Sequence, residues 1–328
     1  MGYTQNATST VCNISNCLFD GKLKNSAATP GDCTFGGMVG YIGAGPKVTA
    51  TNCLSIGTVQ SKITGQFYGA VKNTTCSIVN SYYQGTYVNG SASTVTLPTQ
   101  QATKVTDAQL ASGETCVKLG EAFRQLLGSN AYPVLDDTKP SVYELDVTDV
   151  GYATLVPEAN VLALPAGVTA YAGQKIGSYL LLEEVTELPA DNAVIVKAAE
   201  GTYYYNDTDE ARTLGVANDL TFSGTNVVAD GSQYILAKPD GDEVGFYQAE
   251  AGTTIAARKA YLVSTSGVKG FLITEDDTTG IESLNNQNTP NTPIYNLAGQ
   301  IVNGGWSMVN GKLPRGLYIT NGRKVVVK

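Results

Sequence analysis

The sequence contains no histidine, and this absence restricts the chemistry that its side chains can perform. Histidine is the usual general base and the commonest metal ligand at neutral pH. Nucleophilic pairs of the Ser-His and Cys-His kinds are therefore excluded. No glycine-rich loop joins a strand to a helix in the pattern of a nucleotide site. Catalysis would have to rest on Asp, Glu, Lys, Arg or Tyr.

Acidic residues suggest two further kinds of site. Asp240, Asp242 and Glu243 lie close together, but they lack the twelve-residue spacing of a calcium loop, so we interpret them as a solvated turn. A facing pair of carboxylates for glycoside cleavage remains open, since its members would come from different strands. Few charged residues precede Arg124, the first arginine, whereas a lyase for acidic sugars would normally be more basic. We predict no enzymatic activity and assign no catalytic, cofactor-binding or metal-binding residue.

Tyrosine is abundant, with 19 copies in the chain. Tyr82, Tyr83 and Tyr87 lie in the N-terminal part, and Tyr203 to Tyr205 lie near the middle. Aromatic faces stack on sugars and anchor protein contacts, but aromatic residues also favour β-strands for purely structural reasons. We prefer the structural interpretation, so the binding residues stay unassigned.

A nine-residue phrase occurs three times, as SNCLFDGKL, TNCLSIGTV and VNSYYQGTY. Its asparagines, Asn16, Asn52 and Asn80, are 36 and 28 residues apart. Periods of this length are typical of β-solenoids, in which strands of successive coils stack about 4.8 Å apart. We expect the asparagines to form a column and to hydrogen-bond along it. The glycines at the seventh position should permit a sharp turn or a close backbone contact: Gly21, Gly57 and Gly85. A plain β-meander is the alternative.

All six cysteines lie in the first 116 residues: Cys12, Cys17, Cys33, Cys53, Cys76 and Cys116. No Cys-x-x-Cys pair is present, so a zinc site is not supported. In the stacked arrangement Cys12 and Cys76 lie two coils apart, which is too far for a bridge. Cys17 and Cys53 lie on adjacent coils. We expect free, buried thiols, and a Cys17–Cys53 disulfide is the alternative.

The stretch GGMVGYIGAGPKVTATNCLSIGTV resembles the GLUG repeat, whose pattern is roughly Gly-Gly-Leu-Val-Gly, a turn, and Asn-Cys/Ser-Tyr-Ala-x-Gly-x-Val. Gly37 to Gly40 match the first part, with Met38 in place of Leu. The next copy, from Gly69, lacks the final glycine. The resemblance covers roughly residues 10 to 90 and implies a bacterial surface protein, because such repeats occur in large proteins of that kind.

Residues 108 to 136 resemble the segment that often closes such arrays. Their apolar spacing predicts one or two short amphipathic helices, capped by Asp107 or Ser112. We interpret the segment as an end cap, which a solenoid needs to protect its last coil. The polar stretch DDTKPS, from Asp136, marks a domain boundary, and the first domain is taken as residues 1–138.

From residue 139 to about 280, short alternating strands separated by turn residues predict a β-sandwich. The stretches PADNAVIVKAAEG and AARKAYLVSTSG align when Ala193 is matched with Ala260, an offset of 67 residues. A duplicated β-unit is the simplest explanation. The region also resembles a domain of secreted proteins from gut-type Gram-negative anaerobes, for which no catalytic motif is implied.

The last domain, residues 281–328, follows a linker rich in Asn, Thr and Pro. YITNGRKVVV predicts a β-hairpin around Asn321-Gly322. Together with IYNLAG, from Ile294, and LPRGLYI, from Leu313, it resembles the C-terminal sorting domain of type nine secretion substrates. That resemblance implies export across the outer membrane and possible removal of the tail there. A small structural β-module is the alternative.

The formal net charge of −8 and the pI of about 4.7 disfavour nucleic-acid binding. The sequence has no apolar run long enough for a membrane-spanning helix, and its start, MGYTQNATST, has no signal-peptide character. We predict an all-β monomer: a short right-handed parallel β-solenoid, a β-sandwich and a small C-terminal β-module. The expected function is a non-enzymatic adhesin or binding module for a host protein or glycan, outside a Gram-negative cell or on its outer membrane. A structural stalk and a carbohydrate-active enzyme are the alternatives.

Overall fold

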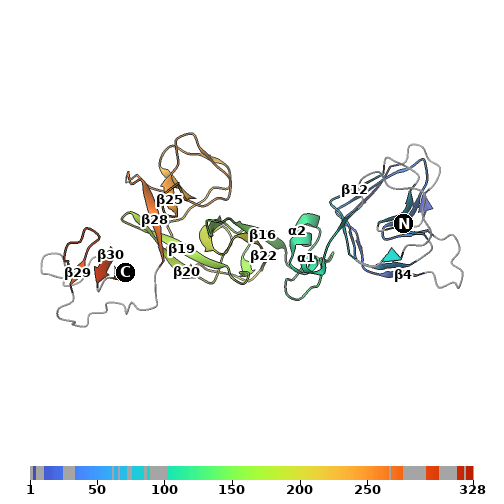
Figure 1. The fold of residues 1–328 in the computed structure, drawn as a ribbon, viewed down its shortest axis with the longest axis horizontal. Helices are drawn as coiled ribbons and strands as arrows, with labels where there is room; N and C mark the ends of the chain where they lie inside the picture. Colours follow the sequence, from blue (N-terminus) through green and yellow to red (C-terminus); the bar gives the residue numbers. More distant parts are fainter. Residues whose placement is uncertain are drawn as a thin grey trace. The chain divides into compact units, whose positions relative to one another are not determined.

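The structure is a computed structural model of the chain. It describes residues 3–4, 11–24, 34–60, 63–65, 67–71, 76–84, 87–88, 102–265, 267–275, 293–302, 316–320 and 323–327. These residues are mostly strands, with two short helices (Figure 1), which confirms the all-β class. The chain divides into two compact units. We call Met1–Leu145 with Tyr203–Thr208 the repeat unit, and Asp146–Thr202 with Asp209–Lys328 the sheet unit.

The repeat unit begins with fifteen short strands in its described part. They are β1 (Tyr3–Thr4), β2 (Val11–Ser15), β3 (Leu18–Phe19), β4 (Lys22–Lys24), β5 (Thr34–Gly36), β6 (Val39–Ile42), β7 (Lys47–Thr51), β8 (Leu54–Ser55), β9 (Thr58–Gln60), β10 (Ile63–Gly65), β11 (Tyr68–Val71), β12 (Ser77–Val79), β13 (Tyr82–Tyr83), β14 (Tyr87–Val88) and β15 (Thr103–Lys104).

These strands pair in parallel with their counterparts in the neighbouring repeats. The sheet orders are β12-β7-β2, β15-β13-β8-β3, β14-β9-β4, β1-β6-β11 and β10-β5. Every described pairing in the set is parallel. The register runs through the repeated phrase, because Ser15 and Val79 both face Thr51. Successive repeats are therefore stacked strand on strand in parallel. A β-meander would pair neighbouring strands antiparallel, so that alternative does not describe these pairings.

The three asparagines occupy the same place in successive layers, so the expected column is confirmed. Asn16, Asn52 and Asn80 have φ values of 51°, 51° and 42°, in the left-handed region that asparagine tolerates better than most side chains. The backbone amides of Asn16 and Asn52 each donate to the next layer at 3.1 Å. Among the described residues no hydrogen bond joins the asparagine side chains. The repeat therefore keeps asparagine for its backbone conformation, and the expected side-chain ladder is not formed.

The glycine expectation is confirmed at Gly57, where backbone and ring approach closely. A Cβ atom there would overlap the Phe19 ring and the carbonyl oxygen of Gly21. A Cβ on Gly21 would lie 3.3 Å from the same ring. The Phe19 ring thus fills the space that the two glycines leave, and Gly85 lies outside the described residues.

Two apolar clusters hold the repeat unit together. The first lies inside the stack and contains Val39, Ile42, Val48, Cys53, Phe67 and Ile78. The second lies on the outer side of β8 and contains Leu54, Val105, Leu110, Cys116, Leu119 and Phe123. It joins the strands to α1 (Asp107–Ala111) and α2 (Glu114–Leu119). The segment interpreted as an end cap therefore covers a flank of the stack, and β15 adds a strand to it.

Thr106, rather than Asp107, caps the first helix. Its hydroxyl accepts from the Gln109 amide, and the Gln109 side chain accepts from the Thr106 amide at 3.0 Å, which is a capping box. Gly113 holds the N-cap position of α2. Ser112, the other predicted cap, accepts from the amide of Glu114 at 3.3 Å. The helix prediction is confirmed, with its first cap placed one residue too late.

A strand from much later in the chain, β22 (Gly201–Asp207), completes the repeat unit. It lies beside β16 (Val142–Val147) in a small sheet, and the rings of Tyr143 and Tyr205 stack with their centroids 5.5 Å apart. Asn206 is buried; it accepts from the Leu127 amide at 2.8 Å and donates to the Gln125 carbonyl at 2.7 Å. Residues about 80 positions apart thus share one polar network, a contact that no sequence pattern announces.

The sheet unit is built on one eight-stranded mixed sheet, in the order β17-β21-β19-β20-β28-β25-β24-β27. Only the β20–β28 pairing within this sheet is parallel. Its eight strands are β17 (Tyr152–Leu155), β19 (Thr169–Ile176), β20 (Tyr179–Val185), β21 (Val194–Lys197), β24 (Gln233–Ala237), β25 (Gly245–Gln248), β27 (Tyr261–Val263) and β28 (Gly270–Glu275). Three strands of the unit lie outside this sheet: β18 (Val161–Ala163), and β23 (Val227–Val228) with β26 (Thr254–Ile255), which pair with each other. The predicted sandwich stays a prediction.

The two halves of the sheet repeat the same pairings, as expected from the 67-residue echo. β19 pairs with β20 and β21, and β24 pairs with β25 and β27 in the same antiparallel sense. The Ala190 amide donates to Asn160 Oδ1 at 2.9 Å, and the Ala257 amide donates to Asn226 Oδ1 at 2.9 Å. The donors are 67 residues apart and the acceptors 66, so one hydrogen bond recurs at nearly equivalent positions, which supports duplication over chance similarity.

Asp191 and Arg258 are also equivalent in this alignment, and they bind each other. Arg258 Nη2 lies 2.9 Å from Asp191 Oδ1, and both residues have positive φ, 55° and 58°. The same guanidinium donates to the Pro157 carbonyl at 2.6 Å and lies 5.5 Å from the Phe222 ring centroid. The duplicated turns therefore meet, and one pair of side chains joins them.

The C-terminal strands form a separate sheet in the order β29-β30-β31. They are β29 (Ile294–Tyr295), β30 (Gly316–Thr320) and β31 (Arg323–Val327). Thr320 faces Arg323 across the last pairing, so only two residues connect β30 to β31. The hairpin predicted around Asn321-Gly322 is confirmed, although those two residues and the predicted linker lie outside the described ranges.

Candidate functional site

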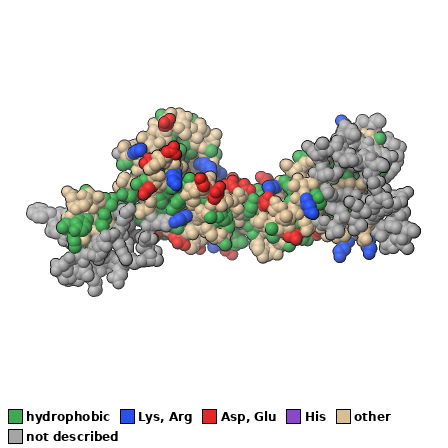
Figure 2. Space-filling view, viewed as in Figure 1, with side chains coloured by type: hydrophobic (Ala, Val, Ile, Leu, Met, Phe, Trp, Pro, Cys, Tyr) green, Lys and Arg blue, Asp and Glu red, His purple; other side chains and the backbone are tan. Residues whose placement is uncertain are grey.

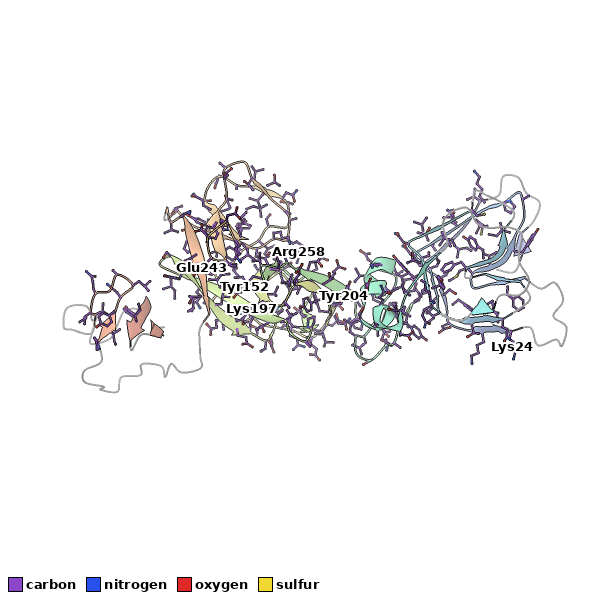
Figure 3. All side chains as sticks on the ribbon, viewed as in Figure 1. Lys24, Tyr152, Lys197, Tyr204, Glu243 and Arg258 are labelled. Carbon is purple, nitrogen blue, oxygen red and sulfur yellow. The ribbon has the colours of Figure 1, made fainter. Side chains whose placement is uncertain are left out.

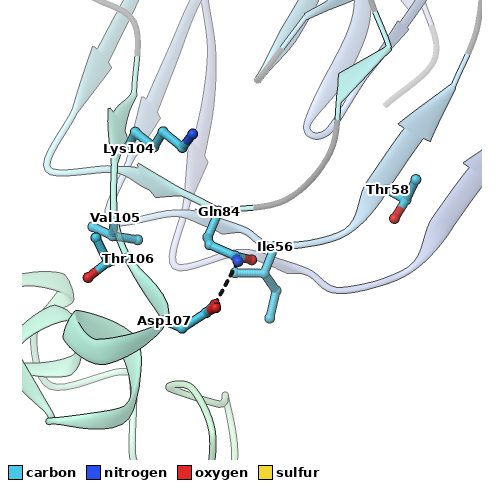
Figure 4. Close-up of a pocket in the computed structure, with 7 residues that line it drawn as sticks. All are labelled: Ile56, Thr58, Gln84, Lys104, Val105, Thr106 and Asp107. Atoms are coloured by element: carbon cyan, nitrogen blue, oxygen red, sulfur yellow. Dashed lines mark hydrogen bonds between the residues drawn. The ribbon is translucent and has the colours of Figure 1, made fainter.

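A groove of about 630 Å³ lies on the repeat unit beside the last stacked layers (Figure 4). Its lining residues come from three parts of the chain: Ile56 and Thr58, Gln84, and Lys104, Val105, Thr106 and Asp107. Each part begins at the end of a strand of the β15-β13-β8-β3 sheet: Ile56 follows β8, Gln84 follows β13, and Lys104 is the last residue of β15. The stacking of repeats therefore gathers residues that are up to 51 positions apart.

The strand register explains this gathering. Ser55 faces Tyr83, and Tyr83 faces Lys104, so the residues after these three leave the sheet at the same corner. The Gln84 amide donates to the Ser55 carbonyl at 3.0 Å, and the Val105 amide donates to the Tyr83 carbonyl at 2.9 Å. The backbone of the groove is thus held by the same hydrogen bonds as the stack.

The groove combines polar groups with a small apolar floor. Gln84 Nε2 donates to Asp107 Oδ1 at 2.7 Å, which fixes the amide and the carboxylate against each other. Lys104 and Thr106 are exposed, whereas Val105 is buried and Ile56 is half-buried. Hydroxyl, amide, carboxylate and ammonium groups beside apolar surface can bind a polar ligand by hydrogen bonds. The lining holds one carboxylate, so it does not supply the two that glycoside cleavage needs.

Lysines border the groove on its neighbouring layer. Lys22 is the register partner of Thr58, and Lys24 is the partner of Gln60. Both lysines are exposed, and Figure 3 shows Lys24 pointing away from the strands. Because side chains two apart on a strand share a face, Lys22 and Lys24 extend the side that Thr58 occupies.

The charge of the chain is divided between its parts. Residues 1–105 contain six lysines, no arginine and two aspartates, a formal charge of +4 within a chain of net −8. The remainder therefore carries −12, and acidic side chains are frequent over the surface of the sheet unit (Figure 2). The repeat unit as a whole has a formal charge of zero, because residues 106–145 and 203–208 bring its acidic and basic residues to nine each. The groove lies at the edge of the lysine-rich range, and its lining holds one lysine, Lys104, and one carboxylate, Asp107.

The acidic residues considered in the sequence do not form a site. Asp242 lies 3.3 Å from Lys269, and the Tyr247 hydroxyl donates to the Glu243 carbonyl at 2.6 Å. Asp240 and Glu243 are exposed. No cluster of three or more potential metal ligands occurs within the described ranges. The interpretation as a turn at the surface agrees with this arrangement.

Three of the six tyrosines considered in the sequence pack on apolar clusters or on another ring. Tyr82 packs on the outer cluster, and Tyr83 packs on the inner one. Tyr205 is buried against Tyr143. In the sheet unit, Lys197 lies 5.6 Å from the Tyr152 ring centroid (Figure 3). The structural interpretation of the strand tyrosines therefore agrees with their burial.

The cysteine thiols are free in the described residues. Cys53, Cys76 and Cys116 are buried, whereas Cys12 and Cys17 are half-buried, so the expectation of buried thiols holds for three of these five. Burial raises the pKa of Cys53 to about 11 and that of Cys116 to about 12. Such thiols stay protonated at neutral pH and are poor nucleophiles. Cys33 lies outside the described residues.

The groove was missed at the level of sequence because its residues carry no motif. Its only sequence signal is positional: Ile56 and Gln84 each lie four residues after the repeat asparagine. No helix in the described part of the chain is long and apolar enough to cross a membrane. No protein-family model, curated protein or solved structure matches the chain.

Proposed function

We propose that the protein is a non-enzymatic binding module, displayed outside a Gram-negative cell or on its outer membrane, that binds an anionic glycan along the groove of the repeat unit. The observation that carries the proposal is the groove itself, where one stacked corner presents Thr58, Gln84 and Lys104. Lys22 borders the same side. Cationic and hydrogen-bonding groups together suit a chain rich in hydroxyl and carboxylate or sulfate groups.

In this proposal residues 1–138 form a right-handed β-solenoid of GLUG-like repeats, residues 139–280 form a β-sandwich, and residues 281–328 form a sorting-like module. The parallel pairing of successive repeats supports the first assignment. The resemblance of the C-terminal sequence supports export. Deleting residues 293–328 should keep the protein inside the cell envelope, and protease accessibility on intact cells measures the difference.

Binding can be tested with a glycan array followed by titration of the full chain against heparin, polygalacturonate and uncharged dextran. We expect binding to the two polyanions, weakened by salt because exposed charges are screened, and little binding to dextran. The double variant Lys22→Gln, Lys104→Gln should weaken polyanion binding about tenfold or more, a loss of about 1.4 kcal/mol or more. The matched control is Lys259→Gln, which removes an exposed lysine of the sheet unit.

A structural stalk is the second candidate, and the continuous in-register stack favours it. A stalk needs the stiffness of paired strands and no ligand. If the folded chain binds neither the arrayed glycans nor the two polyanions, the binding proposal fails and the stalk is preferred. If it binds dextran as tightly as heparin, the groove binds neutral sugars and the anionic assignment is wrong.

A further inference from the structure

The residue after each repeat asparagine makes the same hydrogen bond. Cys17 Sγ donates to the Ser15 carbonyl at 3.3 Å, and Cys53 Sγ donates to the Thr51 carbonyl at 3.2 Å. In the third repeat Ser81 Oγ donates to the Val79 carbonyl at 2.8 Å. Three side chains therefore bridge three identical bends in one column. This position accepts either a thiol or a hydroxyl.

Cys17 and Cys53 are neighbours in that column. The residues after them, Leu18 and Leu54, are register partners, and the Leu54 amide donates to the Cys17 carbonyl at 2.8 Å. Paired strands lie about 4.8 Å apart, which falls within the roughly 4.4 to 6.8 Å between Cα atoms that a disulfide spans. Cys53 Sγ also lies 3.7 Å from the Ile14 carbonyl, so it reaches the layer that holds Cys17.

The other cysteine column lacks this arrangement. Cys12 faces Val48, and the Val48 amide lies 3.3 Å from Cys76 Sγ. A valine layer therefore separates Cys12 from Cys76, at about twice the strand spacing. The chain thus provides one adjacent pair of cysteines and one separated pair in the same stack.

We propose that Cys17 and Cys53 form a disulfide when the protein meets a low-molecular-weight disulfide, joining the first two layers covalently. The Cys17 thiol, which is half-buried and the more accessible of the two, loses its proton and attacks the small disulfide. One small thiolate leaves and takes up that proton. Cys53 then loses its proton, attacks the mixed disulfide at the Cys17 sulfur, and releases the second small thiol. Two protein thiols are oxidised and one small disulfide is reduced to two thiols.

The second step should be the slower one. Burial raises the pKa of Cys53 to about 11, so few molecules hold the thiolate at neutral pH. The rate of cross-linking should therefore rise steeply between pH 7 and pH 9. The product should be favoured once formed, because the stack holds the two sulfurs side by side.

The test incubates the full-length folded protein with oxidised glutathione and quenches it with acid. Peptides are then mapped by mass spectrometry without reduction. The expected result is a peptide pair linked through Cys17 and Cys53, two hydrogen masses lighter than the reduced pair. Treatment with dithiothreitol should restore both free peptides. Oxidised protein should also unfold several degrees higher than reduced protein, because the bridge closes a loop of 36 residues.

Serine variants provide the matched controls, since Ser81 shows that the column accepts a hydroxyl. Cys17→Ser and Cys53→Ser should fold and should lose the difference between the oxidised and reduced unfolding temperatures. Cys12→Ser and Cys76→Ser should keep that difference. Wild-type mapping alone decides the proposal if a variant fails to fold.

The proposal is overturned if oxidation stops at a glutathione adduct on Cys17. A bridge from Cys17 to Cys33 or to any other cysteine also overturns it. The result is independent of the glycan proposal, because peptide mapping needs no ligand and glycan binding needs no bridge.

Discussion

At the residue scale, the same backbone bend occurs three times, and either cysteine or serine makes the same hydrogen bond across it. Asparagine supplies the left-handed backbone at positions 16, 52 and 80, and the next residue bridges the bend with a thiol or a hydroxyl. The sequence predicted the column and the small size of the following residue. It did not predict the hydrogen bond. The bend conformation has to be known before one can see that a cysteine thiol and a serine hydroxyl donate to the same backbone carbonyl.

Replacing Asn52 tests the conformational role of the repeat asparagine. Asn52→Ala should lower the free energy of unfolding by about 1–2 kcal/mol, because a Cβ residue without a polar side chain is strained in the left-handed region. Asn52→Gly should cost much less. Urea denaturation measures both variants, and Asn13→Ala in the exposed part of β2 is the control. Equal costs for alanine and glycine would show that the side chain acts through hydrogen bonds instead.

Ser81 tests the bridging role of the residue after the asparagine. Its hydroxyl accepts from the buried Cys53 amide at 3.0 Å while it donates to Val79. Ser81→Ala leaves that amide unpaired and should cost about 1–3 kcal/mol, measured by urea denaturation. Ser81→Cys repeats the residue of the other layers and should cost less. A variant Ser81→Ala as stable as the wild type would remove this explanation for the repeated thiol and hydroxyl.

At the element scale, the duplicated halves of the sheet unit were visible in sequence, whereas their junction was not. The echo around Ala193 and Ala260 predicted equal strands, and the pairings of β21 and β27 agree. The aligned turn positions hold Asp191 and Arg258. Because the two residue types differ, an alignment of the halves does not mark these positions as related. Their meaning depends on the way one half packs on the other, and this is a tertiary property.

Exchanging the two turn residues tests the junction. Asp191→Arg alone and Arg258→Asp alone should each destabilise the protein, because two like charges then face each other. Arg258→Asp also removes the donor of the hydrogen bond to the Pro157 carbonyl. The double exchange should recover stability, with a coupling of about 0.5–1 kcal/mol in a double-mutant cycle. The exposed pair Asp242–Lys269 is the control, since such pairs contribute little. Additive losses at 191 and 258 would contradict a direct pairing.

At the scale of the whole molecule, stability should be almost constant across neutral pH. The chain has no histidine, and the shifted groups titrate elsewhere. Hydrogen bonds from Thr138 and Ser232 lower the pKa values of Asp136 and Asp230 below 3.8, so their stabilisation is present at neutral pH and is lost as the pH falls below about 4. Burial raises the pKa of Cys53 from 9.0 to about 11. Folding therefore favours the protonated thiol, and stability should fall as the pH rises above 9.

Thermal unfolding from pH 2 to pH 11 under reducing conditions checks this profile. The midpoint should form a plateau between about pH 6 and pH 8 and decline on both sides. Cys53→Ser should shift the alkaline decline upward, since the buried thiol is gone. A midpoint that changes by many degrees between pH 6 and pH 8 would contradict the profile.

The overall organisation was predictable where local patterns decide it. Repeats, strand-rich composition and the Asn-Gly hairpin predicted the all-β class, the stacked layers and the C-terminal turn. The helix segment was recognised by its apolar spacing, but its packing on Leu54 was not, because an outward-facing strand residue looks exposed until a neighbour covers it. The groove was unpredictable for a related reason: Thr58, Gln84 and Lys104 share one corner only after three layers have stacked.

The division of the chain into interleaved units affects the order in which the protein can be made. Residues Tyr203–Thr208 belong to the repeat unit, although 57 residues of the sheet unit, Asp146–Thr202, precede them. The buried Asn206 binds groups at positions 125, 127 and 141. A ribosome or an export channel that delivers the chain from its N-terminus must therefore release residue 206 before the first unit can close. Until then the Leu127 amide and the carbonyls of Gln125 and Ser141 lack their partner Asn206 and remain open to water or to chaperones.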